Sequence, residues 1–334
     1  MKALRNLLIL LLLLAAAAAG GAAWWLNRPL ALAAASVEVS VEPGSSPRDI
    51  AQAWVRAGVQ APSLLLYQWF RWSGQSRKIR AGSYEIGAGT TPIKLLDKMV
   101  RGDETLSTVR LLEGWTFRQF RAELAKADAL KPTTAALSDA ELMAALGAPG
   151  VAPEGRFHPD TYAYSKGSSD LAVLKRAYHA MQIRIDAAWQ ERSADTPLRS
   201  ADDALVLASI VEKETGTAAD RGRVAGVFVN RLRIGMPLQT DPTVIYGLGA
   251  AFDGNLRKRD LLADTPYNTY TRAGLPPTPI AMPGKAALLA AVRPDPTKAL
   301  YFVARGDGSS EFSETLADHN RAVTQFQRGG QRSK

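Results

Sequence analysis

Cysteine is missing from this 334-residue sequence, and histidine occurs only three times, at His158, His179 and His319. Without cysteine the chain forms no disulfides and no thiolate metal sites, which is compatible with an oxidising compartment. The three histidines do not stand at the spacing of a zinc motif. We therefore expect neither a bound metal ion nor a cofactor. His158 lies in a predicted loop, where an ordinary structural role is favoured, and His319 lies on the apolar face of a predicted helix, where a core role is favoured.

Acidic residues are moderately outnumbered, with 32 Asp and Glu against 41 Lys and Arg, so the formal net charge is +9. The basic residues are scattered, and no block of them matches a nucleic-acid-binding motif. We therefore expect no nucleic-acid partner. A positive balance suits an anionic lipid surface or an acidic polymer, although it serves solubility equally well.

Charge is also absent from a long stretch near the N-terminus, Asn6 to Asn27. About 20 apolar residues are enough to cross a bilayer as a helix. Trp24 and Trp25 suit the far interface, and the basic residues before the stretch suit the cytoplasmic side. We predict a cytoplasmic tail over residues 1–6 and a transmembrane helix over 7–27. A cleaved signal peptide is the alternative, because the alanine-rich stretch offers small residues for cleavage.

A strand–turn–helix pattern recurs after a short tether. A predicted strand, 37–41, precedes Ser46, which is a suitable N-cap and is followed by proline. Thr91 repeats this arrangement 45 residues later, and Thr116 caps a third, looser copy. Units of this kind predict a small α+β layer structure.

The segment LLLYQWFRWSG, residues 64–74, lies between the first two copies and is rich in aromatic residues. A packed helix is the favoured interpretation, because core helices have this composition. A platform on which sugars stack is the alternative.

The segment SADDALVLASIVEKETG carries two glutamates in an otherwise apolar run. Ser200 is the predicted N-cap, the helix is expected to reach about Glu214, and Gly216 is the predicted stop. Glu212 and Glu214 are two residues apart, which is about 200° around a helix axis, so they face different ways.

The neighbours of the two glutamates differ in size. Ala208 and Ser209 lie one turn before Glu212, whereas bulky residues lie one turn before Glu214. Small neighbours leave room for a ligand, so we predict Glu212 at the floor of a cleft. A solvated helix terminus is the alternative for both glutamates.

Two polar loops follow this helix. Gln239, Thr240 and Asp241 form the first cluster, and Asn268 and Tyr270 belong to the second. Amide, hydroxyl and phenol groups with aromatic faces supply what a sugar ring requires. We predict that these five residues bind substrate in a polysaccharide cleft, although ordinary surface loops have similar compositions.

Four stretches of the chain resemble the endolytic murein transglycosylases, the YceG-like family. They are ASIVEKET, VFVNRLRIGMPLQTDPTVIYG, TPYNTYTRAGLPPTPIAMPG, and LYFVA with the later F, L and HN. The resemblance is dense over residues 200–325. It implies an α+β fold class with a transmembrane helix, a small LysM-like domain over 37–110 and a larger catalytic domain over 111–330.

The resemblance also implies an activity and a cellular location. It implies a single-pass protein of the inner membrane whose periplasmic domain cuts nascent peptidoglycan glycan strands internally. Cleavage would leave 1,6-anhydro-muramoyl ends and terminate strand elongation, with peptidoglycan synthases as partners. Glu212 matches the catalytic glutamate of the family, the first one of its EKET motif. His158 departs from the family, which often has a bulky apolar residue there.

One carboxyl group suffices for such a reaction. Protonated Glu212 would give its proton to the leaving oxygen, and its carboxylate would then accept the proton of the muramoyl C6 hydroxyl, the internal nucleophile. This cycle requires a raised pKa, which an apolar environment provides. Two alternatives remain: a non-catalytic scaffold that binds glycan and recruits a synthase, and a true hydrolase that yields reducing ends.

Overall fold

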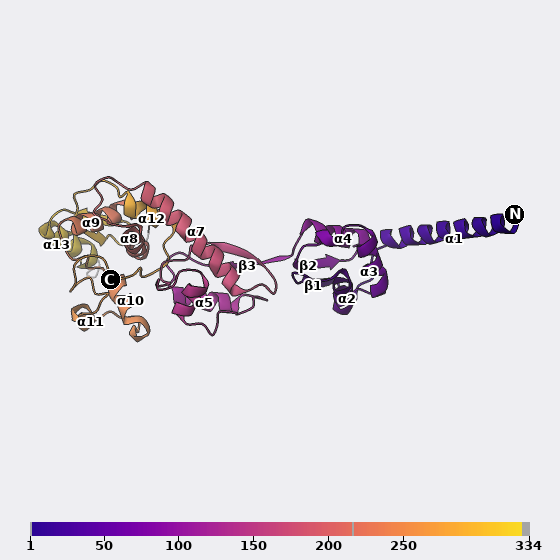
Figure 1. Cartoon of the computed structure of the whole chain (residues 1–334). Helices are drawn as coiled ribbons and strands as arrows, with labels where there is room; N and C mark the ends of the chain where they lie inside the picture. Colours follow the sequence, from indigo (N-terminus) through magenta and orange to yellow (C-terminus); the bar gives the residue numbers. More distant parts are fainter. Residues whose placement is uncertain (1, 216, 329–334) are drawn as a thin grey trace. The chain divides into compact units, whose positions relative to one another are not determined.

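The computed structural model describes residues 2–215 and 217–328 of the chain. Gly216, the predicted stop of the helix with the two glutamates, lies outside the described residues. The described residues form helices and three two-stranded sheets (Figure 1), which confirms the predicted α+β class.

The described residues divide into two units. Unit 1 comprises the residues up to Thr108 with Asp128–Lys131 and Ala163–Ser168, and unit 2 comprises Val109–Ala127, Pro132–Tyr162 and the residues from Ser169 onward. The predicted domain limits, 37–110 and 111–330, stay predictions.

The long N-terminal helix α1 (Lys2–Asn27) contains the predicted span. Residues Leu4–Asn27 are long and apolar enough to cross a membrane, with a mean hydropathy of 2.3, and their most apolar stretch is not buried against other residues of the chain. A signal sequence has the same properties, so both interpretations of this helix stay open.

Unit 1 surrounds one antiparallel strand pair with short helices (Figure 1). In the pair, Ser36 lies opposite Gly87 and Val41 lies opposite Gly82. Its elements are β1 (Ser36–Val41), α2 (Pro47–Ala57), α3 (Ser63–Trp72), β2 (Gly82–Gly87) and α4 (Pro92–Arg101). Trp54 is fully buried at the centre of the core of this unit.

The predicted helix caps are confirmed. Ser46 accepts a hydrogen bond from the N–H of Asp49, whose carboxylate bonds back to Ser46, and Thr91 caps α4. Thr116 caps α5 (Phe117–Lys126) in the same way. The third copy of the pattern does not extend the β1–β2 layer, because its strand β3 (Leu106–Arg110) pairs with β4 (Thr161–Ser165) in a separate sheet.

The aromatic segment 64–74 folds as the helix α3, which confirms the packed-helix interpretation. Leu66 and Phe70 are fully buried in the core of unit 1. Trp72 is 78% exposed, so the outer face of the helix keeps apolar side chains on the surface.

Unit 2 is built around helix α8 (Ala201–Glu214), which packs against α7, α9, α10 and α12. All residues from Ala204 to Val211 are buried, so the helix is central, as its all-round apolar sequence predicts. Ser200 caps it as predicted. The other helices and strands of the unit are α5 (Phe117–Lys126), α6 (Asp139–Ala145), α7 (Asp170–Gln190), α9 (Arg221–Arg233), α10 (Asp241–Leu248), α11 (Lys258–Leu262), α12 (Lys285–Val292), β5 (Tyr301–Ala304), β6 (Ser310–Ser313) and α13 (Leu316–Val323).

The core of unit 1 should depend on Trp54, whose indole N–H also lies 3.4 Å from the Met99 sulfur. We expect Trp54→Ala to lower the free energy of unfolding by about 3–5 kcal/mol, because it removes buried surface and leaves a cavity. The matched control is Trp72→Ala, for which we expect a change within about 0.5 kcal/mol. Urea unfolding of the full-length chain, followed by circular dichroism, measures both. Equal losses in the two variants would contradict the buried position of Trp54.

Candidate active site

Glu212 lies in the last turn of α8 and is partly buried. Its Oε2 atom accepts a hydrogen bond of 2.9 Å from the backbone N–H of Gly284. One turn earlier, the Ser209 hydroxyl accepts a bond of 3.0 Å from the N–H of Ile280 and donates to the carbonyl of Val206. The segment 280–284 is therefore fixed along the end of α8 and positions a donor on the carboxylate.

The small residues before Glu212 have a different role from the predicted one. Ala208 and Ser209 are both fully buried. They do not leave space for a ligand, because the segment 280–284 packs there instead. The prediction that Ala208 and Ser209 leave room for a ligand is wrong.

A second segment runs beside the first. The N–H of Gly114 donates to the carbonyl of Met282 (2.9 Å), and the N–H of Met282 donates to the carbonyl of Trp115 (2.8 Å). The Lys213 ammonium donates to the Gly114 carbonyl at 3.3 Å. The short ladder places residue 113 next to Glu212.

Glu113 brings a second carboxylate to this place. A Cβ atom added at Gly284 would overlap the Oε1 atom of Glu113, while the N–H of the same glycine bonds to Glu212. Because both carboxylates touch one glycine, their nearest oxygens are within about 8 Å of each other. Glu113 is exposed, whereas Glu212 is partly buried. Sequence reasoning missed Glu113, since it lies 99 residues before Glu212 and belongs to no sequence pattern shared with it.

Burial is the main cause that raises the pKa of Glu212 above its ordinary value. The Gly284 N–H opposes this rise because it stabilises the carboxylate, and the negative charge of Glu113 adds to the rise. A raised pKa keeps more of the carboxyl group protonated near neutral pH, as a general acid requires.

A hollow of about 480 Å³ begins at Glu113. It is lined by residues 110–113 and 159–161, which include the charged side chains of Arg110 and Asp160. This hollow offers a surface of mixed polar and apolar character that includes the Glu113 carboxylate.

Glu214 points to a different cluster. The Thr240 hydroxyl donates to the Glu214 carboxylate, and the Tyr270 hydroxyl donates to Asp241 at 2.5 Å. Burial is the main cause that raises the pKa of Glu214. Three of the predicted substrate-binding residues, Thr240, Asp241 and Tyr270, thus gather around Glu214 and not around Glu212.

The other two predicted residues differ in their environment. Asn268 is fully buried, and its Oδ1 accepts the N–H of Tyr270. Its amide donates to three carbonyls, those of Asp260, Leu261 and Ala263. These bonds suit a residue that shapes the loop. Gln239 has an exposed side chain and a φ of +48°, a left-handed conformation that is uncommon for this residue type.

Glu154 is a second titratable group that sequence reasoning missed. It is 7% exposed, and its carboxylate accepts hydrogen bonds from the Phe117 N–H (3.0 Å) and the Tyr246 hydroxyl (3.2 Å). Burial raises its pKa to about 7. The sequence between Pro153 and Pro159 does not indicate a buried carboxyl group, because the hydrogen-bond partners of Glu154 lie 37 and 92 residues away.

His158 and His319 both pack against other residues of unit 2. His158 is buried, and its backbone N–H donates to the carbonyl of Ala177. Burial lowers its pKa to about 4. His319 stacks on Tyr301 with ring centroids 5.3 Å apart.

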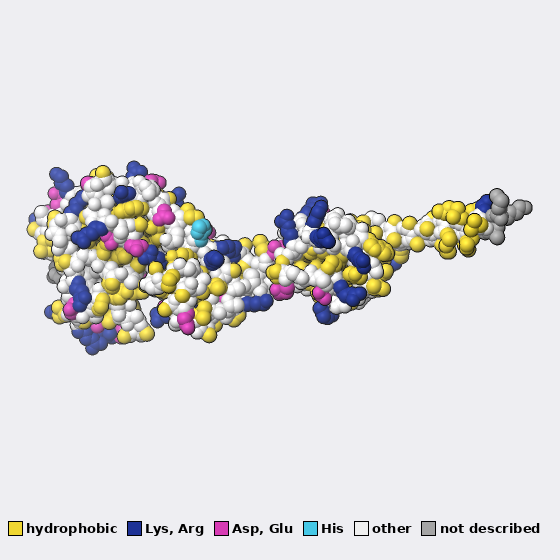
Figure 2. Space-filling view, in the orientation of Figure 1, with side chains coloured by type: hydrophobic (Ala, Val, Ile, Leu, Met, Phe, Trp, Pro, Cys, Tyr) yellow, Lys and Arg dark blue, Asp and Glu magenta, His cyan; other side chains and the backbone are white. Residues whose placement is uncertain are grey.

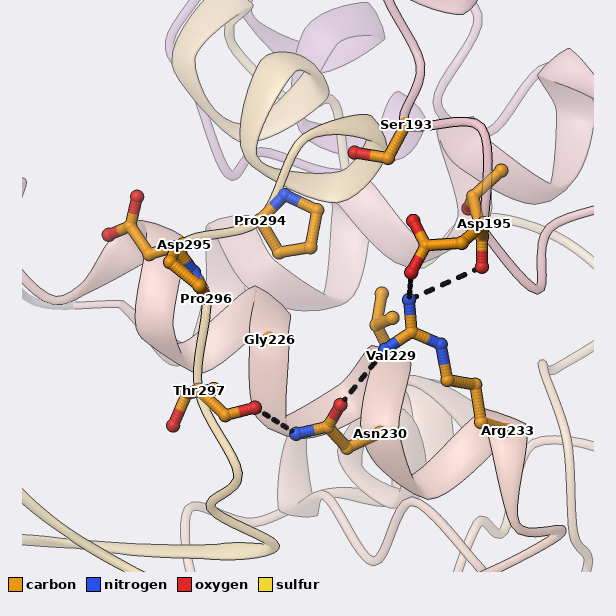
Figure 3. A pocket seen from close by; sticks show the side chains of 11 residues that line it. Ser193, Asp195, Gly226, Val229, Asn230, Arg233, Pro294, Asp295, Pro296 and Thr297 are labelled. Atoms are coloured by element: carbon orange, nitrogen blue, oxygen red, sulfur yellow. Dashed lines mark hydrogen bonds and ion pairs between the residues drawn. The ribbon is translucent and has the colours of Figure 1, made fainter.

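A separate pocket of about 320 Å³ lies beside α9 (Figure 3). Arg233 pairs with Asp195 at 2.5 Å, and the Asn230 amide donates to the carbonyl of Thr297 at 2.8 Å. These polar groups satisfy one another, and no residue of α8 lines the pocket. We therefore do not assign it to the site.

Known proteins resemble this chain along most of its length. The model of the YceG-like family matches residues 39–325. An endolytic murein transglycosylase of Bacillus subtilis (strain 168) is 39% identical over 174 residues, 52% of this chain and 48% of that protein. One of Streptococcus pneumoniae is 25% identical over 322 residues, 86% of this chain and 58% of that protein. The chain spans about half the length of these curated relatives.

A solved structure supports the fold. The crystal structure of a yceG-like protein from Listeria monocytogenes has a TM-score of 0.54 and 28% identity. The match covers 86% of this chain and 98% of that one.

The pKa of Glu212 should respond to Glu113. Glu113→Gln is expected to lower it, because the variant removes a neighbouring negative charge. Gly284→Ala should lower it too, since the added Cβ displaces the flexible end of Glu113, and the double variant should add little. Carbon-13 NMR of the Glu212 carboxyl group over a pH titration measures the effect. An unchanged pKa in Glu113→Gln would contradict the proximity of the two groups.

Stability should depend on pH through Glu154. Its folded-state pKa, about 7, lies above the ordinary value of 4.5, so the folded chain favours the neutral form. This contribution is complete below about pH 4.5 and is lost as the pH rises through 7, a change of about 3 kcal/mol. The control is Glu154→Gln, which keeps an acceptor for the Phe117 N–H but does not titrate. The difference in unfolding free energy between the two proteins should change from pH 5 to 8; a constant difference rules the effect out.

Proposed function

The chain belongs to the YceG-like family, and on that basis we propose that it is an endolytic lytic transglycosylase of peptidoglycan. It cuts nascent glycan strands, leaves 1,6-anhydro-muramoyl ends and terminates strand elongation. The observation that carries this proposal is Glu212, a partly buried carboxyl group with a raised pKa that a backbone N–H holds at the end of α8. The names of the relatives from B. subtilis and S. pneumoniae support the same substrate class.

In the proposed reaction, Glu212 acts twice. Its protonated form donates to the glycosidic oxygen that leaves, and the Gly284 N–H then stabilises the carboxylate that forms. This carboxylate accepts the proton of the muramoyl C6 hydroxyl as that oxygen attacks the anomeric carbon. The attack is intramolecular within the sugar, so it gains the advantage of proximity.

The predicted substrate-binding residues keep their place in the proposal. Gln239 and Asp241 are exposed and available to sugar hydroxyls, and Tyr270 and Thr240 orient the neighbouring carboxylates. Asn268 contributes by holding the loop that carries Tyr270. The residues around Glu214 thus form a second polar surface at the C-terminal end of α8, the end that also carries Glu212.

We extend the proposal to the rest of the chain. Residues 1–6 are cytoplasmic, the span 7–27 crosses the inner membrane once, and the remainder is periplasmic. Residues 37–110 act as a LysM-like glycan-binding domain, and 111–330 form the catalytic domain. The apolar helix α1 and the β1–α2–α3–β2 arrangement support these assignments. Peptidoglycan synthases are the proposed protein partners.

Glu113 favours a second candidate function, hydrolysis. Inverting glycosidases place two carboxyl groups about 6.5–9.5 Å apart, with a water molecule between them. The upper bound of about 8 Å between the nearest oxygens of Glu113 and Glu212 is compatible with such a pair, and Glu113 is exposed to water. In this alternative, Glu113 is the base that activates water, and the products carry reducing ends.

Product analysis tests the proposal. We expect Glu212→Gln to slow the cleavage of glycan strands at least about 10²-fold, because it cannot exchange a proton. Glu314→Gln is the matched control, since Glu314 is exposed and lies in the same unit. Strand length and end groups are read by mass spectrometry.

The outcomes separate the candidates. Anhydro ends from the wild type, lost in Glu212→Gln, support the transglycosylase. Reducing ends that disappear in Glu113→Gln support hydrolysis. Strands that bind but are never shortened by the wild type support a non-catalytic scaffold.

A further inference from the structure

An apolar surface on unit 1 has no role in the proposed chemistry. We define the α3 patch as the exposed side chains Leu64 (59%), Leu65 (44%), Trp72 (78%) and Ile93 (38%). Leu65 and Trp72 are seven residues apart, so they lie on one face of α3. Trp69 lies between them on that face, and its indole N–H donates to the carbonyl next to Ile93, at the start of α4. The four side chains therefore belong to one surface.

The α3 patch lies where α1 leaves unit 1. The N–H of Leu30 donates to the carbonyl of Thr90, three residues before Ile93. Gln60, which lies four residues before Leu64, donates its N–H to the carbonyl of Ala31. Figure 1 shows α3 at the end of the unit from which α1 emerges, and α1 also contacts α4.

The connection between α1 and the unit is short and packed. Leu30 is 7% exposed within the core of unit 1, and Trp25, near the end of α1, packs against the same core. Only eight residues separate Asn27 from β1, which begins at Ser36. A unit tied this closely to a membrane helix is held at the height of the lipid headgroups.

Basic residues accompany the apolar ones. Arg71 lies seven residues after Leu64 on α3, and Lys94 follows Ile93; both are exposed. Arg28 lies over the ring of Trp24 at the end of α1, 4.9 Å from its centroid. Figure 2 shows basic side chains among hydrophobic ones on this end of the unit. Aromatic and aliphatic side chains flanked by cations are what an anionic bilayer surface binds.

We propose that the α3 patch docks unit 1 on the outer surface of the bilayer that α1 spans. Leu64, Leu65, Trp72 and Ile93 enter the headgroup region, and Arg71 and Lys94 contact anionic lipid phosphates. The inference rests on the membrane insertion of α1, which is part of the proposed function. It adds a second, peripheral contact that fixes the orientation of unit 1 on the membrane.

The lack of cysteine makes a direct test simple. Single-cysteine variants of the full-length chain, each carrying an environment-sensitive fluorophore, are reconstituted in vesicles of phosphatidylcholine with phosphatidylglycerol. Leu64→Cys and Trp72→Cys report on the α3 patch. Pro43→Cys is the water-facing control, because it follows the far end of β1, about 17 Å from the end near α1. Leu12→Cys reports on the insertion of α1.

We expect labels at positions 64 and 72 to be quenched by spin-labelled lipid and shielded several-fold from aqueous iodide relative to the label at 43. Omitting phosphatidylglycerol should reduce this shielding. Labels at 64 and 72 as open to iodide as the label at 43, with position 12 in lipid, would overturn the docking surface and leave the anchor intact. A label at 12 that is open to water would overturn both.

A glycan strand is the alternative occupant of the α3 patch. The same fluorescent labels distinguish it from the membrane. In detergent micelles without lipid, added glycan strands should leave the label at 72 unchanged. If strands shield it there while lipid does not quench it in vesicles, the α3 patch binds sugar and the membrane proposal fails. The cleavage assay with Glu212→Gln is independent of all these outcomes.

Discussion

The hydrogen bond from the Gly284 N–H to Glu212 is the contact on which the rest of the site depends. It requires the segment 280–284 to lie along the end of α8, and the buried Ser209 hydroxyl holds that segment through Ile280. The glycine at 284 matters in another way, because an added Cβ atom would overlap the Glu113 carboxylate and displace it. One backbone donor thus fixes the acid and leaves room for a second carboxylate beside it. The donor favours the charged form of Glu212, while burial favours the neutral form, and burial is the larger effect.

Three glutamates of unit 2 show how environment divides one side-chain type into different roles. Glu154 is buried and spans two elements, since it accepts the first N–H of α5 and the hydroxyl of Tyr246 on α10. Glu212 is partly buried and keeps one oxygen free of backbone donors. Glu113 is exposed, so its charge is available to solvent. Phe117, whose N–H donates to Glu154, lies only four residues after Glu113. The packing of α5 is therefore linked to the position of Glu113 in the site.

Local signals made much of the fold predictable. The caps Ser46, Thr91 and Ser200 and the limits of α8 follow from side-chain chemistry within a few residues. Long-range pairings were not predictable in this way. The small size of Ser209 suggested room for a ligand, but the N–H of Ile280 packs against it. That partner lies 71 residues further on, and no local sequence pattern indicates the hydrogen bond. Asn268 looked like a sugar ligand because the type of a polar residue does not reveal whether its bonds are already used.

The two candidate reactions share their first step and differ in the nucleophile. In both, Glu212 protonates the leaving oxygen, and a positively charged sugar centre develops. The outcome then depends on whether the C6 hydroxyl or a water molecule reaches that centre first. Glu113 bears on this choice through its exposure: a base open to solvent can hold water near the centre, whereas a sugar that fills the hollow beside residues 110–113 excludes it. Whichever nucleophile is used, a carboxylate at Glu113 keeps Glu212 protonated to higher pH, because the second negative charge is unfavourable next to the first. The same side chain therefore supports the acid in either reaction, and only its role after bond cleavage distinguishes them.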